Sequence, residues 1–266
     1  MAAVESTARP HAWLVVAGQE LRDLWLGGRG LLLSLAFSGL LSVLSYLVAT
    51  NQALNFLEQR ESVNLTLQVA IAVGALLALL AGADAISGER ERGSLESLLL
   101  TPVSRLQLTG GKVLAALSLW IAAFVITIPY VWFLGRGVGI VRDALAVGVL
   151  VGTLLAIFLV SLGVLVSIFA GSNRVSLSVS LFVLLALFAP TQFPTSAQQG
   201  WAGDLFLRAN PLTAGEHYVG KIVVDGHPWS QDASWLVSPV IAAVLFAFLA
   251  AIAGARLMRL SGDVSR

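Results

Sequence analysis

Six long stretches of the chain contain no Asp, Glu, Lys or Arg, and charged segments separate them: 30–52, 62–83, 113–135, 144–173, 175–203 and 233–255. A helix needs about 20 apolar residues to cross the ~30 Å hydrocarbon core of a bilayer. Runs such as Leu76 to Leu80 do not alternate apolar with polar residues, which excludes barrel strands. We therefore expect an all-α integral membrane protein, one domain over 1–266, with spans at 31–50, 63–84, 112–134, 145–170, 175–193 and 236–256.

The composition agrees with a bilayer as the main solvent. Hydrophobic residues make up 57% of the chain and charged residues 12%, against roughly 25% charged in soluble domains. The net charge of +1 gives no indication of nucleic-acid binding, and the absence of cysteine excludes disulfides and thiolate metal sites.

Ahead of the first span, the segment from His11 to Gly28 has the spacing of an amphipathic helix. Its apolar face comprises Trp13, Ala17, Leu21, Leu24 and Trp25, and its polar face Gln19, Arg22 and Asp23. This pattern predicts a helix that lies in the membrane interface. The interfacial residues are expected to be Trp13, Glu20, Arg22 and Trp25. The alternative is that the segment is only the start of the first span.

Lys and Arg are distributed unevenly between the two sides of a six-span chain. With the N-terminus inside, the inner segments hold eleven and the outer segments five, although the loop with Arg136 and Arg142 runs against the trend. The positive-inside rule then places both termini in the cytoplasm of a multi-pass protein of the inner (cytoplasmic) membrane. The outer segment 195–234 contains turn formers such as Asn210-Pro211, and we expect it to be a small folded extracytoplasmic unit.

The loop between the second and third spans is the most distinctive polar segment. Seven charges lie between Asp84 and Arg105, in a connection much longer than two helices need. We expect Gly88 and Gly93 to break the backbone around 89–92, and a new helix to start at Thr101-Pro102. The resulting elbow would expose charges and leucines for docking into a groove of another protein. The alternative is a solvated loop with no partner.

The residues from Gly88 to Arg105, followed by Gly111-Lys112, resemble the coupling-helix signature of ABC-2 (type-2 ABC exporter) permeases. The segment Val16 to Asp23 resembles the amphipathic entry helix of that family, and the six-span layout matches it. The resemblance implies a coupling segment at 86–110, in which Glu89 to Glu96 would sit in the groove of a separate ATP-binding subunit and Pro102 to Arg105 would begin the arm to the third span. It also implies a second, smaller contact at 172–174. The implied coupling residues are Glu89, Arg90, Glu91, Arg92, Gly93, Ser94, Leu95, Glu96, Pro102, Ser104, Arg105, Ser172, Asn173 and Arg174.

The same resemblance implies a non-catalytic permease subunit. This chain would bind no cofactor, and ATP and Mg would be held by two copies of the partner ATPase. A second permease copy would complete a homodimer, with an extracytoplasmic accessory protein as a further partner. The alternative function is a membrane scaffold in an ABC complex that acts on such an outer partner and has no cargo of its own.

Three other signals are weak. Gly110-Gly111-Lys112 lacks the upstream glycine and the following Ser or Thr of a phosphate-binding loop. The three histidines, at positions 11, 217 and 227, are too scattered to indicate a metal site. No span carries an ionisable residue near its middle, which disfavours a proton-coupled carrier.

Overall fold

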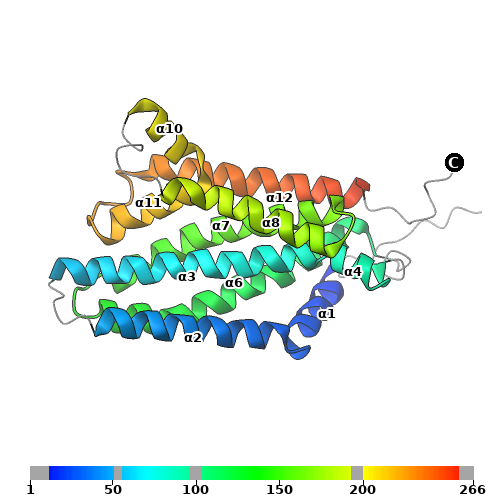
Figure 1. The fold of residues 1–266 in the computed structure, drawn as a ribbon, viewed down its shortest axis with the longest axis horizontal. Helices are drawn as coiled ribbons and strands as arrows, with labels where there is room; N and C mark the ends of the chain where they lie inside the picture. The colour runs from blue at the N-terminus through cyan, green and yellow to red at the C-terminus, as the bar shows by residue number, and fades with distance from the viewer. Residues whose placement is uncertain (1–11, 51–55, 96–102, 193–199, 258–266) are drawn as a thin grey trace, which may run out of the picture.

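The computed structural model describes residues 12–50, 56–95, 103–192 and 200–257, and these residues form helices and connections without a strand (Figure 1). The helices are α1 (Ala12–Leu26), α2 (Arg29–Ala49), α3 (Phe56–Asp84), α4 (Ser87–Glu91), α6 (Arg105–Gly135), α7 (Val141–Phe169), α8 (Asn173–Phe188), α10 (Trp201–Ala209), α11 (Pro211–Val223) and α12 (Val237–Leu257), with short 3-10 helices η1 (Ala189–Gln192) and η2 (Ala233–Leu236). The all-helical fold expected from the sequence is confirmed for this part of the chain.

Within the described residues, five helices are long and apolar enough to cross a membrane: Arg29–Ala49, Gln59–Glu91, Arg105–Gly135, Val141–Phe169 and Ala233–Arg256. They lie side by side along the long axis of the molecule (Figure 1). Helix α8 occupies the expected fifth span, but it has only 16 residues, which is about 24 Å at 1.5 Å per residue. The 3-10 turn with Pro190 follows at once, because proline cannot supply the backbone donor that a longer α-helix needs.

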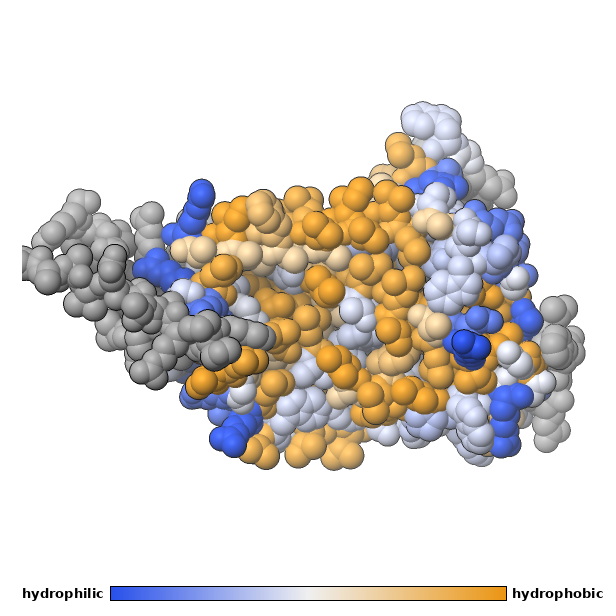
Figure 2. Space-filling view, turned by 180° about the vertical axis from the view of Figure 1, so that it is seen from behind, coloured by the Kyte–Doolittle hydropathy of each residue, from blue (hydrophilic) through white to orange (hydrophobic). Residues whose placement is uncertain are grey.

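Polar and apolar side chains separate along the bundle. An apolar belt covers the middle of the face in Figure 2, and hydrophilic residues gather at both ends. We name these ends the α4 end, which also holds α1 and the start of α8, and the α11 end, which also holds α10 (Figure 1). This distribution is that of a protein whose middle faces lipid.

Helix α7 forms the centre of the bundle, with α3 packed along it. Two glycines allow this close approach: a Cβ at Gly163 would lie 2.5 Å from the carbonyl oxygen of Leu79, and a Cβ at Gly82 would lie 2.7 Å from that of Val160. Small residues at a crossing let helix backbones come together in a membrane, where packing replaces the hydrophobic effect as the driving force.

Helix α2 is peripheral by comparison. It contacts the bundle through the buried side chains of Phe37 and Leu41, and through a hydrogen bond of 2.7 Å between Ser42 and the Tyr130 hydroxyl of α6. Most of its large apolar side chains, including Leu35 and Leu47, are exposed. The rest of its surface therefore suits lipid or another protein in the membrane.

At the α11 end, the segment after α8 is folded, as expected. Asn210 caps α11 through a bond of 2.9 Å from the Leu212 N–H to its side-chain oxygen. The buried ring of Tyr218 donates its hydroxyl to the Trp229 carbonyl at 2.8 Å. Positions 195–199 of the predicted unit lie outside the described residues, and its extracytoplasmic location stays a prediction.

Two expectations about the 86–110 segment were wrong in detail. Gly88 does not break the backbone, because it lies inside α4; Gly93, with φ of 72°, does end that turn. The next described helix starts at Arg105 and not at Pro102, because Ser104 is extended and forms a capping box with Gln107. Residues 96–102, including Thr101, lie outside the described residues.

Candidate functional site

The start of α4 is capped by a residue from another helix. Ile86 precedes α4 and offers no capping side chain. Instead, the hydroxyl of Ser167, near the end of α7, accepts the backbone N–H groups of Ile86 at 3.0 Å and Ser87 at 2.8 Å. These N–H groups are buried, so an unsatisfied one would cost about 1–3 kcal/mol. Ser167 thereby attaches α4 to α7.

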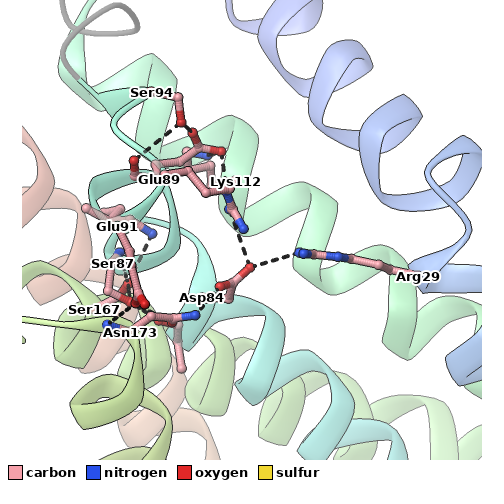
Figure 3. A network of polar contacts seen from close by, with 12 residues as sticks. Arg29, Asp84, Ser87, Glu89, Glu91, Ser94, Lys112, Ser167 and Asn173 are labelled. Carbon is pink, nitrogen blue, oxygen red and sulfur yellow. Dashed lines mark hydrogen bonds and ion pairs between the residues drawn. The ribbon is translucent and has the colours of Figure 1, made fainter.

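Asn173, the first residue of α8, joins three groups at once (Figure 3). Its side-chain nitrogen donates to Asp84 at 2.7 Å, and its side-chain oxygen accepts from the Ser87 hydroxyl at 3.0 Å. Its backbone N–H donates to the Glu91 carboxylate at 3.2 Å. The end of α3, α4 and the start of α8 therefore share one side chain.

Arg90 links α4 to the end of α7. Its guanidinium donates to the carbonyl of Ile168 at 3.2 Å and to that of Ala170. Ala170 is the C-cap of α7, whose last carbonyls have no partner within the helix. A cation at this helix end also complements the helix dipole.

Lys112 connects α4 to α1 and α6. Its side chain is only 2% exposed, and its ammonium lies 2.7 Å from the Glu20 carboxylate of α1 and 3.7 Å from that of Glu89 in α4. Glu89 also accepts from the Ser94 hydroxyl. A buried ammonium is tolerated only when paired, so this one fixes α1 and α4 to the start of α6.

Asp84, at the end of α3, completes a cluster of polar side chains, which we name the charged cluster. Its residues are Glu20, Arg29, Asp84, Ser87, Glu89, Arg90, Glu91, Arg92, Lys112, Ser167 and Asn173. The carboxylate of Asp84 lies 3.3 Å from the guanidinium of Arg29, at the start of α2 (Figure 3). It also lies 3.7 Å from the guanidinium of Arg92. The two arginine side chains are 66% and 45% exposed. These pairs are partly solvated and contribute little free energy each, but they connect α2 to the same cluster.

Most of the predicted coupling charges thus make hydrogen bonds or ion pairs with other residues of this chain. We expected Glu89 and its neighbours to point outward, but Glu89 is paired with Lys112 and Leu95 is buried. Ser104 and Ser172 are caps of α6 and α8, and Arg105 is the first residue of α6. The predicted coupling residues that are exposed are Arg90, Glu91, Arg92, Gly93, Ser104 and Arg174; Glu96 and Pro102 lie outside the described residues.

Helix α1 stands steeply across the α4 end, and is not a continuation of α2 (Figure 1). The chain turns between them at Gly28, whose φ is 82°. Trp25 donates from its ring to the Ser118 hydroxyl at 3.0 Å, and Arg22 is exposed. Trp13 belongs to α1. A helix in this position suits the membrane interface, which stays a prediction.

Five residues of the cluster were not among the implied coupling or interfacial residues: Arg29, Asp84, Ser87, Lys112 and Ser167. One signal was available, because a lysine at the edge of a long apolar run must find an anionic partner. Ser167 gave no signal, since a hydroxyl in an apolar helix usually bonds its own backbone.

A cleft of about 720 Å³ opens beside the cluster, between α1, α2, α3, α4 and α6. Its lining combines charged residues, such as Arg29, Asp84 and Lys112, with leucines and alanines. The described residues contain no group of three or more His, Asp or Glu side chains placed to hold a metal ion.

Residues 14–205 match the model of a protein family described as ABC-2 family transporter protein. The chain belongs to the ABC-2 transporter family. The match includes the whole charged cluster and the helices that carry it, from Glu20 of α1 to Asn173 of α8. No curated protein matches the sequence significantly. ABC-2 membership and the apolar helices identify an integral membrane protein of a transporter, and they imply association with an ATP-binding subunit.

Proposed function

We propose that this chain is the permease subunit of an ATP-driven exporter, and that α4 receives motion from a separate ATP-binding subunit. The observation that carries the proposal is that α4 is joined by side chains to the ends of several long helices. Ser167 and Arg90 connect it to α7, and Glu89 connects it through Lys112 to α6. A displacement of α4 would thus reach the membrane-crossing helices directly.

The docking surface in this proposal is the exposed side of α4 and the start of α8. Arg90, Glu91 and Arg92 are exposed on α4 and its C-cap, and Arg174 is exposed on α8. Arg174 makes no hydrogen bond or ion pair with the described residues, which leaves its guanidinium available to a partner. A desolvated charge pair at an interface costs 2 kcal/mol or more when one member is removed.

The proposed assembly has two copies of this chain and two ATP-binding subunits, in the inner membrane, with both termini in the cytoplasm. The α4 end then faces the cytoplasm, where ATP is available, and the α11 end faces outward. The Lys/Arg distribution supports this orientation. The exposed apolar surface of α2 supports a second protein in the membrane. ATP and Mg belong to the partner, which leaves this chain without a catalytic role.

The test separates docking from folding. Arg174→Glu reverses one exposed charge and breaks no internal contact of the described residues, so it should leave yield and thermal stability unchanged. It should reduce co-purification with the ATP-binding subunit at least tenfold. The matched control is Arg142→Glu, because Arg142 is exposed and lies at the start of α7, near the other end of the bundle. Normal co-purification of Arg174→Glu would refute this docking surface.

A second variant tests transmission. Glu89→Gln removes the carboxylate that Lys112 contacts at 3.7 Å and leaves the exposed side of α4 intact. We expect the subunits to assemble while the membrane-bound chain loses its effect on ATP hydrolysis. ATP hydrolysis of the reconstituted complex, with and without this variant, measures that coupling. Unchanged stimulation would exclude Glu89 as part of the transmission path.

One feature favours the alternative function, a membrane scaffold for an outer partner. Helix α10 exposes the large apolar side chains of Trp201, Leu205 and Phe206 at the α11 end. Such a patch suits a protein interface or the membrane surface. Replacing all three by serine should abolish binding of an outer partner in the scaffold case, and should leave ATP-driven export intact in the permease case.

A further inference from the structure

The cleft at the α4 end changes from charged to apolar in the same direction on three helices. On α2, Arg29 is followed by Leu32 and Leu33 one turn further in; on α3, Asp84 is preceded by Leu80. On α6, Lys112 is followed by alanines and then Leu119. Because these helices run along the bundle, the change occurs over roughly one to two turns, about 5–10 Å.

This gradient has the dimensions of the boundary between lipid head groups and acyl chains. The volume of about 720 Å³ is that of a ligand site, and the described elements leave it unfilled. Leu33, Leu77 and Leu80 are only half-buried. A purely polar ligand would leave these leucines in contact with water, and a purely apolar one would desolvate the charges. An amphiphile satisfies both parts.

The charges at the mouth indicate the kind of head group. Arg29 and Arg92 are each held by ion pairs of 3.3 to 3.7 Å and are 66% and 45% exposed, so both guanidiniums have donors free for a phosphate. The first backbone N–H groups of α2 also lack a side-chain cap, since Gly28 precedes them. One end of the mouth is thus suited to an anion.

Asp23 supplies the opposite charge. Asp23 lines the cleft and is exposed, and its carboxylate has no hydrogen bond or ion pair with the described residues. The other carboxylates of the mouth, those of Glu20, Asp84 and Glu89, are already paired. The mouth therefore offers two arginines to a phosphate and one unpaired carboxylate to an ammonium.

We propose that this cleft binds a phospholipid with a phosphoethanolamine head group, the phosphate between Arg29 and Arg92, the ammonium at Asp23 and the acyl chains along the leucines of α2 and α3. The lipid comes from the leaflet on the α4 side. A primary ammonium donates hydrogen bonds to a carboxylate, which a choline group cannot do, and a glycerol head group places no positive charge near Asp23. The inference concerns binding by this chain alone and does not depend on the proposed transport function.

The experiment is native mass spectrometry of the purified full chain in detergent, with added phosphatidylethanolamine, phosphatidylglycerol and phosphatidylcholine of identical acyl chains. Phosphatidylethanolamine should be retained at about tenfold lower concentration than the other two. Glycerophosphoethanolamine, which has the head group without chains, should bind at least tenfold more weakly. Equal binding of the three lipids, or equal binding of the chain-free head group, would overturn the proposal.

Variants locate the site. Arg29→Gln should weaken binding of phosphatidylethanolamine about tenfold, and Asp23→Asn should remove its preference over phosphatidylglycerol. Arg22→Gln changes an exposed charge next to Asp23 outside the cleft lining, and should have no effect. Ala81→Phe fills the apolar part and keeps every charge, so it should reduce binding of all lipids at the site even if Arg29→Gln folds poorly. Retention of lipid by Asp23→Asn and Ala81→Phe at the wild-type level would place the lipid elsewhere.

Discussion

The crossing of α3 and α7 and the charged cluster at the α4 end hold helices together in opposite ways. At the crossing, Gly82 and Gly163 bring two backbones into direct contact. At the cluster, side chains such as Lys112 and Arg92 bridge helix ends, and some of them are half-exposed. Close packing resists rearrangement, whereas partly solvated ion pairs exchange with water at little cost. The close-packed contact lies in the last turn of α3 and within two turns of the end of α7, so it directly adjoins the adaptable one at the end where we propose that a partner docks.

The largest expected effect is at the crossing. Gly163→Val places a Cβ 2.5 Å from the Leu79 carbonyl oxygen, and backbone cannot move aside as a flexible side chain can. We expect the free energy of unfolding of the variant to fall by more than about 3 kcal/mol, or the variant to fail to fold. Gly39→Val is the control, because a Cβ at Gly39 in α2 meets nothing within 4 Å. Thermal unfolding in detergent measures both; similar stabilities would show that the α3–α7 contact is not rigid.

A smaller effect is expected at the cluster. Lys112→Met removes a nearly buried ammonium and leaves the Glu20 carboxylate, 22% exposed, without its partner at 2.7 Å. Because Glu20 reaches water, we expect the free energy of unfolding to fall by about 2 kcal/mol. Removing one member of a fully buried pair costs more, roughly 3–5 kcal/mol. Adding Glu20→Gln should restore part of this loss.

The surface pair of Lys221 and Asp225 provides the control for Lys112. Their charged atoms lie 2.8 Å apart, but both side chains are partly exposed. Lys221→Met should therefore change the free energy of unfolding by less than about 1 kcal/mol. If Lys112→Met and Lys221→Met lower the free energy of unfolding equally, burial of the Lys112 ammonium does not strengthen its contribution to stability.

The smallest effect concerns pH at the α11 end, outside the long helices. Burial raises the pKa of the Glu216 carboxyl in α11 from its ordinary value of 4.5 to about 7. The folded state therefore retains a proton that the unfolded chain releases, so stability falls as pH rises from about 4.5 to 7 and stays lower above that. Glu216→Gln should flatten this dependence. The free energy of unfolding of the variant, relative to that of the wild type, should therefore be higher at pH 8 than at pH 5. If variant and wild type differ in stability by the same amount at the two pH values, the raised pKa of Glu216 would be contradicted.

The sequence was sufficient for the broad fold. Long stretches without charge predict membrane-crossing helices, because lipid solvates neither ions nor unpaired backbone groups. The same pattern overestimated the fifth span, since apolar composition continues past Phe188 while Pro190 ends the regular helix. The amphipathic spacing before the first span also located α1, and the turn formers after 195 indicated a folded segment.

What only the tertiary structure decided is which charges face each other. From the sequence, the charges at 89–92 have the pattern of an exposed docking loop, because nothing local shows that Lys112, 23 residues after Glu89, lies within 3.7 Å of it. The capping of α4 by Ser167 is equally non-local, and the hydroxyl has no distinguishing context in its own helix. Composition and periodicity indicate whether a helix is surrounded by lipid, water or protein. They do not indicate which side chains meet, because that depends on how the helices cross. That crossing is set by pairs such as Gly82 and Gly163, whose importance appears only once α3 and α7 are in contact.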